Sequence, residues 1–326
     1  MFFARGPIED MQILRLVIER ILLSLLTLLL VSLVIFFMLE ILPGDVATRI
    51  LGRDATPESL AALRAQLHLG DPALLRYATW LGNLLTGNLG HSLVSDRLIT
   101  AILAPRIFNT VLLSIYAFLI YIPLTAIPAM IQAVRRDRAV DHGLSVVTLV
   151  LLSMPDFLLG TALLILFVIM VPILPAISLV DETSGAGEYI RAMTLPAVTL
   201  AIVMAVYAVR MLRDNLIEVL DSDYVRMAEL KGLSPARVLV RHALPNALVP
   251  TLNVTALNLA YLVGGVVVVE KIFGYPGFGS LLVDALQLRD LPLIEATIMI
   301  AAGVYIVANL LADVGAILLN PRLRQG

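Results

Sequence analysis

Long apolar runs alternate with short polar segments along most of this chain. Six of the runs reach the length of about 20 residues that a helix needs to cross the hydrocarbon core of a membrane. Because lipid offers no partner for free backbone N–H and C=O groups, these runs predict transmembrane helices. The predicted spans are residues 17–41, 105–132, 143–172, 194–213, 248–270 and 294–318.

The spans predict an all-α polytopic membrane protein with about six transmembrane helices. They divide the chain into an N-terminal stretch at 1–16, a long external segment at 42–104, a five-helix core at 105–318 and a C-terminal stretch at 319–326. Basic residues gather in the cytoplasmic loops of membrane proteins, and the loop at 133–142 holds Arg135, Arg136 and Arg138. Both termini are therefore predicted to be cytoplasmic.

The external segment is predicted to contain short helices. Thr56 favours a helix start, with Pro57 at the first helical position, where its missing N–H costs nothing. Tyr77 and Trp80 are of the kind that gathers at the membrane interface. The segment is either a packed lid or a docking surface for a partner, and the sequence leaves both interpretations open.

The composition changes the picture mainly by exclusion. Of the 326 residues 60% are apolar and 15% charged, whereas soluble domains hold about 45–50% apolar and about 25% charged residues. The net charge of −2 gives no basic excess for binding nucleic acid. The absence of cysteine excludes thiolate metal sites, disulfides and cysteine nucleophiles. The first apolar run is longer than the core of a signal peptide, which predicts a retained helix.

The most polar run outside the external segment is 214–247, and it predicts a helical hairpin. Asp223 is the expected cap of a first helix from Tyr224 to Lys231, which Gly232 ends in the left-handed conformation. Ser234 is the expected cap of a second helix, with Pro235 at its first position and Pro245 at its end. The hairpin is either a well-capped connector or a rigid lever that a cytoplasmic partner pushes.

The hairpin resembles the "EAA" loop of inner-membrane permeases of ATP-binding cassette (ABC) importers. That loop reads Glu-Ala-Ala, three residues, Gly, nine residues, then Ile-x-Leu-Pro. Arg226-Met227-Ala228, Gly232 and His242-Ala243-Leu244-Pro245 have the same spacing, although Arg226, Met227 and His242 depart from the pattern. Further segments are similar to the peptide, nickel and opine branch of this family, at 42–45, 87–92, 270–273, 276–279, 289–292 and 320–322.

The resemblance implies a type I importer permease in the bacterial inner membrane. Its implied partners are a homologous second permease, two cytoplasmic ATP-binding subunits, a periplasmic or lipid-anchored solute-binding protein and membrane lipid. The cargo it favours is di- or oligopeptides, with nickel, opines and glutathione-like solutes left open. The residues it implies for coupling to the ATPases within 222–245 are Asp223, Tyr224, Arg226, Met227, Ala228, Glu229, Lys231, Gly232, His242, Leu244 and Pro245.

No catalytic constellation is found in the sequence. The two lysines, Lys231 and Lys271, follow Leu230 and Glu270, so neither belongs to a phosphate-binding Gly-x-x-x-x-Gly-Lys-[Ser/Thr] loop. The four histidines show no His-Glu-x-x-His spacing. We therefore expect a transport subunit that is not an enzyme and holds no metal or cofactor, with ATP and Mg²⁺ bound by partner subunits.

Five residues are candidates for the pathway or its gate. Asp156 follows Pro155 at a predicted helix break, where it either lines the pathway or caps the helix. Asn258 is alternatively a contact between helices. The glycines of 274–279 permit close backbone approach, either in a re-entrant turn that closes the fifth span or in a gate or docking loop that faces the binding protein. The candidates are Asp156, Asn258, Glu270, Gly277 and Gly279.

The alternative function is a self-contained secondary transporter or channel. Such proteins often show inverted repeats, paired broken helices and buried coupling residues. The sequence has no clear internal repeat and few charges within the spans. A membrane-bound enzyme is disfavoured by the missing catalytic motifs, which leaves the importer permease as the favoured hypothesis.

Overall fold

The computed structural model describes residues 7–41, 56–66, 70–178 and 185–319. Two of the family-like segments, 42–45 and 320–322, lie outside these residues. Within the described ranges the one departure from helix and loop is an isolated bridge between His91 and Leu98. The predicted all-α class is confirmed.

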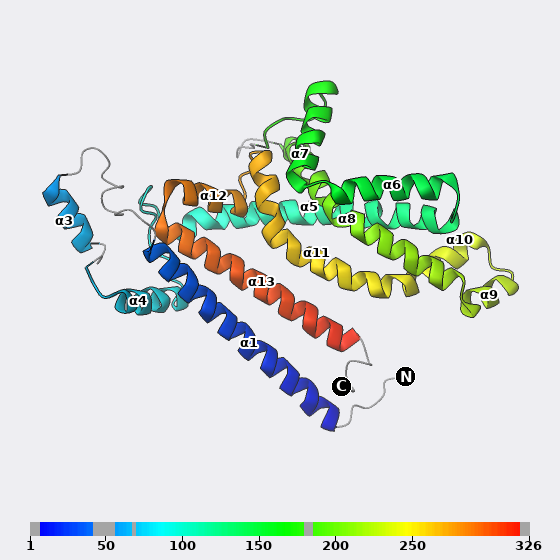
Figure 1. Cartoon of the computed structure of the whole chain (residues 1–326), viewed down its shortest axis with the longest axis horizontal. Coiled ribbons are helices and arrows are strands. Elements are labelled where there is room, and N and C mark those ends of the chain that lie inside the picture. The colour runs from blue at the N-terminus through cyan, green and yellow to red at the C-terminus, as the bar shows by residue number, and fades with distance from the viewer. Residues whose placement is uncertain (1–6, 42–55, 67–69, 179–184, 320–326) are drawn as a thin grey trace. The chain divides into compact units, whose positions relative to one another are not determined.

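Each predicted apolar run falls on one or more of the described helices, and further short helices lie between the runs. By length and composition, four of the described helices can cross a membrane, or up to five when a bent pair counts as one span. Helix α11 runs through the predicted span 248–270. In chain order the helices are α1 (Pro7–Glu40), α3 (Pro57–Gln66), α4 (Ala73–Leu85), α5 (Ile99–Val134), α6 (Ala139–Ser153), α7 (Asp156–Leu164), the π-helix η2 (Ile165–Met170), α8 (Ala186–Leu220), α9 (Asp223–Leu230), α10 (Pro235–Val238), the π-helix η3 (Leu239–Ala243), α11 (Leu244–Ile272), α12 (Phe278–Leu288) and α13 (Leu291–Leu319) (Figure 1).

One compact unit comprises residues 1–106 and 281–326. In it α1 and α13 lie side by side (Figure 1), and α4 packs against α1. Tyr77 and Trp80 of α4 contact the ring of Phe36, with centroids 5.4 and 5.8 Å away. The hydroxyls of Tyr77 and Ser32 are 2.8 Å apart. These two aromatic residues of the external segment therefore pack against the first span.

The helix start predicted at Thr56 is also confirmed. The Thr56 hydroxyl accepts a hydrogen bond from the backbone N–H of Ser59 at 3.1 Å, which satisfies one of the free donors of the first turn of α3. Pro57 occupies the first helical position, as expected.

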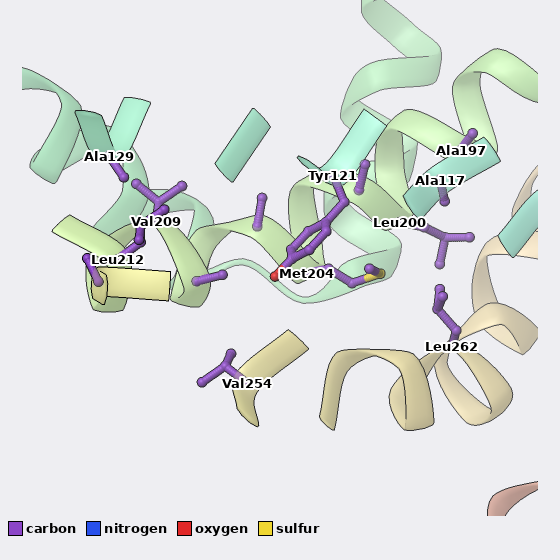
Figure 2. Close-up of a cluster of buried hydrophobic side chains, with 14 of the residues drawn as sticks. Ala117, Tyr121, Ala129, Ala197, Leu200, Met204, Val209, Leu212, Val254 and Leu262 are labelled. Atoms are coloured by element: carbon purple, nitrogen blue, oxygen red, sulfur yellow. The ribbon is translucent and has the colours of Figure 1, made fainter. Parts of the chain in front are cut away.

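The second unit comprises residues 107–280 and is built around α8. Helices α6, α7 and α11 all pack against α8. Its side chains Leu200, Met204 and Leu212 are almost completely buried. Figure 2 shows them between small and aromatic residues of α5 and apolar residues of α11. The helix that carries the predicted hairpin at its end is thus the core of its unit.

The third predicted span, 143–172, is not one continuous helix. It is split into α6 and α7, which meet at an angle of 110°. Met154 has φ −88° and ψ 130°, the extended conformation that a following proline imposes by steric clash. Pro155 then begins the turn into α7, so the predicted break is confirmed but is much sharper than a proline kink.

Candidate functional site

The predicted cytoplasmic hairpin consists of α9, α10 and η3 and leads directly into α11 (Figure 1). Its first helix starts one residue earlier than expected. Ser222 occupies the N-cap position with extended backbone angles, and Asp223 is the first helical residue. The Ser222 hydroxyl donates back to the carbonyl of Val219 at 2.6 Å, which fixes the turn between α8 and α9. The prediction of Asp223 as the cap was therefore wrong, because two adjacent polar residues competed for this position.

Gly232 ends α9 as the sequence predicts. Its φ is +78°, in the left-handed region that favours glycine. The N–H of Gly232 donates to the carbonyl of Glu229 at 2.8 Å, and the N–H of Leu233 donates to the carbonyl of Ala228 at 3.4 Å. This pair of bonds is the Schellman motif, which fixes the angle at which the chain leaves the helix.

The second half of the hairpin differs from the prediction at its end. Ser234 and Pro235 take the predicted N-cap and first positions of α10, although Ser234 makes no side-chain capping bond. Pro245 does not end the helix, since it lies in the first turn of α11. The wider π-helix η3 joins α10 to α11, so the chain remains helical through this junction.

The hairpin has a buried face and an exposed face. Val225, Ala228, Val238 and Ala243 are buried and belong to the main apolar cluster of their unit. Residues of α9 three and four positions apart share a side of the helix, so the opposite side carries large exposed residues. These exposed apolar residues of α9 are Tyr224, Met227 and Leu230, and Val240 of η3 is exposed as well.

A contact between Tyr224 and His242 joins the two halves of the hairpin. The Tyr224 hydroxyl and His242 Nδ1 are 2.9 Å apart, and the rings meet edge to face with centroids 5.9 Å apart. His242 stands where the family-like pattern has isoleucine. At this position the chain therefore makes a polar contact across the hairpin, which isoleucine could not make. Arg226 and Glu229 are exposed on α9, and Lys231 is exposed at the C-cap that follows it.

Three of the predicted gate residues meet around one buried carboxylate. Glu270 is completely buried near the end of α11 and accepts hydrogen bonds from the Thr110 hydroxyl and from the backbone N–H of Ser280, the latter at 2.8 Å. A Cβ atom at Gly277 would overlap this carboxylate, and one at Gly279 would lie 2.7 Å from the Cα of Val267. Glycine is required at 277 because the α11–α12 turn folds directly onto Glu270, and at 279 because the start of α12 lies against the backbone of α11.

Further bonds hold the same turn against α5. The Thr110 hydroxyl accepts from the backbone N–H of Phe278 at 2.7 Å. The Tyr275 hydroxyl donates to the carbonyl of Asn109 at 2.8 Å, and the Asn109 side chain donates to the carbonyl of Pro276 at 2.9 Å. Burial raises the pKa of Tyr275 well above its usual range, so this hydroxyl remains a donor. The turn is a packed element of its unit.

Two models of known families match the chain. Residues 122–325, which include the hairpin and the Glu270 turn, match the model described as a binding-protein-dependent transport system inner membrane component. Residues 13–94 match the N-terminal model of the same kind of membrane component. The chain belongs to this family. It is therefore a multi-pass inner-membrane permease of an ABC importer, and the ATPase activity belongs to separate subunits.

The permease is similar to several other proteins over almost its whole length. It is 33% identical over 308 residues to a protein of Sinorhizobium fredii named as a peptide ABC transporter permease, which covers 94% of this chain and 98% of the relative. A Brucella abortus protein whose name assigns it to a peptide transport system is 35% identical over 95% of this chain and 98% of its own. A glutathione transport system permease of Escherichia coli O6:H1 is 34% identical over 94% and 98%.

The other two pathway candidates of the permease do not join the Glu270 turn. Asp156 is the first residue of α7, directly after the sharp bend, and is partly buried. The Asn258 side chain donates to the carbonyl of Met204 at 3.0 Å and so joins α11 to α8. This contact favours the interpretation of Asn258 as a link between helices. Among the residues described, no His, Asp or Glu group could hold a metal ion.

The sequence did not predict an ion-pair network beside the hairpin of the permease. Arg136, in the α5–α6 turn, bonds Asp221 at 2.7 Å, and Asp221 is the residue that ends α8. Deeper in the unit, Arg213 of α8 holds Asp141 of α6. The sequence shows the arginines at 135–138, but no sequence pattern indicates that Arg136 pairs with Asp221, which lies far along the chain.

Two of the family-like motifs meet at a second buried carboxylate. Asp290, the residue before α13, accepts bonds from the Ser92 hydroxyl and from the backbone N–H of Leu93, the latter at 3.1 Å. Both Ser92 and Asp290 are nearly completely buried. The segments 87–92 and 289–292 are therefore parts of one structural element within the first unit.

Proposed function

We propose that the permease imports peptides together with a homologous second permease and two cytoplasmic ATP-binding subunits. A periplasmic or lipid-anchored solute-binding protein delivers the cargo. ATP and Mg²⁺ bind to the ATP-binding subunits, and this chain holds no cofactor. Both termini and the 222–245 hairpin lie in the cytoplasm. Closure of the ATP-binding subunits moves the hairpins and opens the pathway between the two permeases outward, which is alternating access.

The observation that carries this proposal is the exposed apolar surface of the hairpin. Tyr224, Met227 and Leu230 lie more than half exposed on α9, although its opposite side is built into the core. Aromatic residues and methionine are enriched in protein interfaces, and contiguous exposed apolar side chains mark binding sites. A rigid helix with a buried side and an exposed apolar side is suited to receive a push and pass it on.

The experiment is a detergent pull-down of the tagged permease from cells that express all its partners. Leu230 is 78% exposed, so Leu230→Glu leaves the fold intact and places a charge on the proposed docking surface. We expect the affinity for the ATP-binding subunits to fall by about 30-fold, which corresponds to about 2 kcal/mol, the loss typical of an interface hot spot.

The matched control is Leu288→Glu, which changes another leucine that is 60% exposed, on α12. This variant should retain the ATP-binding subunits at the level of the unmodified permease. If Leu230→Glu retains them equally well, the hairpin is not the docking surface. If no ATPase copurifies with the unmodified permease either, and an ion gradient drives uptake, the chain is a secondary transporter.

The peptide cargo is supported by the names of relatives that are 33–35% identical over almost the whole chain. The test is uptake into proteoliposomes that hold the complete complex and its own solute-binding protein. A mixture of labelled di- and oligopeptides should accumulate in an ATP-dependent manner. If a nickel chelate, an opine or glutathione accumulates and peptides do not, the cargo assignment is wrong while the importer assignment stands.

A further inference from the structure

The strongest interaction beside the hairpin is the ion pair between Asp141 and Arg213. Arg213 Nε donates to Asp141 Oδ1 at 2.8 Å and Nη2 donates to Oδ2 at 2.6 Å, so the guanidinium grips the carboxylate with two parallel bonds. Asp141 is only 1% exposed. A bidentate arginine–carboxylate pair is strong and also fixes the relative orientation of the elements that carry it.

The pair joins three elements of the second unit. Asp141 lies in the first turn of α6, Arg213 lies in α8, and Asp141 Oδ2 also accepts from the backbone N–H of Asp137 in the α5–α6 turn at 3.0 Å. The side chain of Gln132, from the last turns of α5, donates to Ser145 of α6 at 3.2 Å. The end of α5, the turn and the start of α6 are thereby held to α8 as one block.

The position of this block relative to the hairpin suggests a role beyond holding the fold. Arg213 lies eight residues, about 12 Å along the helix, before Asp221. Asp221 is the last residue before the hairpin and bonds Arg136 of the same α5–α6 turn. Two contacts of different depth therefore hold this region to α8: the buried bidentate pair made by Asp141 of α6, and the exposed pair made by Arg136 of the turn. From the block, α6 leads directly to the 110° bend before Asp156.

We infer that Asp141 and Arg213 are positioning residues that make α6 follow α8 when the ATP-binding subunits move the hairpin. This inference rests on the proposed function, because it assigns the route by which that movement enters the broken span. The pair neither touches the cargo nor binds nucleotide. Its loss should uncouple hydrolysis from transport while the hairpin still holds its partner.

The experiment measures ATP hydrolysed per peptide imported in proteoliposomes of the complete complex. Asp141→Asn removes the charge with little change in shape. We expect this variant to retain the ATP-binding subunits and their hydrolysis, while peptide imported per ATP falls by roughly 2- to 30-fold, the range seen for residues that carry coupling between sites. Arg136→Gln, which breaks only the exposed pair, is the matched control and should change the ratio less than Asp141→Asn.

A second pair of variants separates positioning from folding. The chain has no cysteine, so Asp141→Cys with Arg213→Cys introduces the only two thiols of this permease. A short bifunctional thiol reagent should restore the import per ATP that the double variant loses, because a covalent link replaces the ionic one. An unchanged ratio in Asp141→Asn, or no recovery after cross-linking, would overturn the inference. If the unmodified permease fails to retain any ATPase, the proposed function itself has failed.

Discussion

Replacing Gly277 by alanine tests how tightly the α11–α12 turn is built on Glu270. The added Cβ would overlap the carboxylate of Glu270, which must therefore move away. Gly277 lacks the positive φ of Gly274, so the expected penalty comes from the overlap rather than from backbone strain. The variant therefore isolates the interactions of one side chain.

The magnitude follows from the bonds that Glu270 loses. Its displacement leaves the Ser280 N–H, which is buried, and the Thr110 hydroxyl without their acceptor. An unsatisfied buried donor costs about 1–3 kcal/mol. We expect a destabilisation of about 2–5 kcal/mol, which lowers the melting temperature by about 4–20 °C at about 2–4 °C per kcal/mol.

The assay is thermal unfolding of the purified permease in detergent, within a double-mutant cycle. In a Glu270→Ala background the colliding atoms are gone, so Gly277→Ala should cost less than about 0.5 kcal/mol there. Gly160→Ala is the matched control, because its Cβ would meet only ordinary contacts at 3.5 Å. Equal losses from Gly277→Ala in both backgrounds would refute the reasoning, since the overlap with Glu270 could not then be the cause.

Three further substitutions test other parts of the fold by the same melting assay. Gly232→Ala meets no atom within 4 Å, so only the left-handed conformation should penalise it, by about 1–2 kcal/mol; a larger loss would mean that space, not φ, requires glycine. Met204→Ala opens a cavity at a side chain that is 1% exposed and should cost about 2–5 kcal/mol; a loss below about 1 kcal/mol would contradict the packing around α8. Ser92→Ala removes a bond to Asp290 and should cost about 1–3 kcal/mol; no loss would show that the bond is not formed.

Features that depend on local chemistry were predictable from the sequence. Thr56 with Pro57, and Gly232 with Ser234 and Pro235, mark helix boundaries because capping and left-handed backbone conformations depend on a few adjacent residues. The apolar runs predicted the long helices because their length matches the thickness of the hydrocarbon core of a membrane. The cap of α9 was misplaced by one residue, from Ser222 to Asp223, since both side chains can serve there.

Features that depend on contacts between distant segments were not predictable. Glu270 and Gly277 are close in sequence, but the role of Thr110 depends on how α5 packs, 160 residues away. Pro155 signalled a break, yet its angle of 110° depends on how α7 packs against α8. Pro245 was expected to end a helix. In the structure the π-helix η3 precedes it and joins α10 to α11, which the sequence did not indicate.

The buried contact between Ser92 and Asp290 bears on how this family can recombine. Ser92 falls within the stretch matched by the N-terminal family model, 13–94, and Asp290 within the stretch matched by the other, 122–325. The two stretches therefore match separate family models, but hydrogen bonds to Asp290 from Ser92 and Leu93 join them in the fold. A chimera that takes its external segment from one relative and its helical core from another keeps this hydrogen bond only when the first parent carries the serine and the second carries the aspartate.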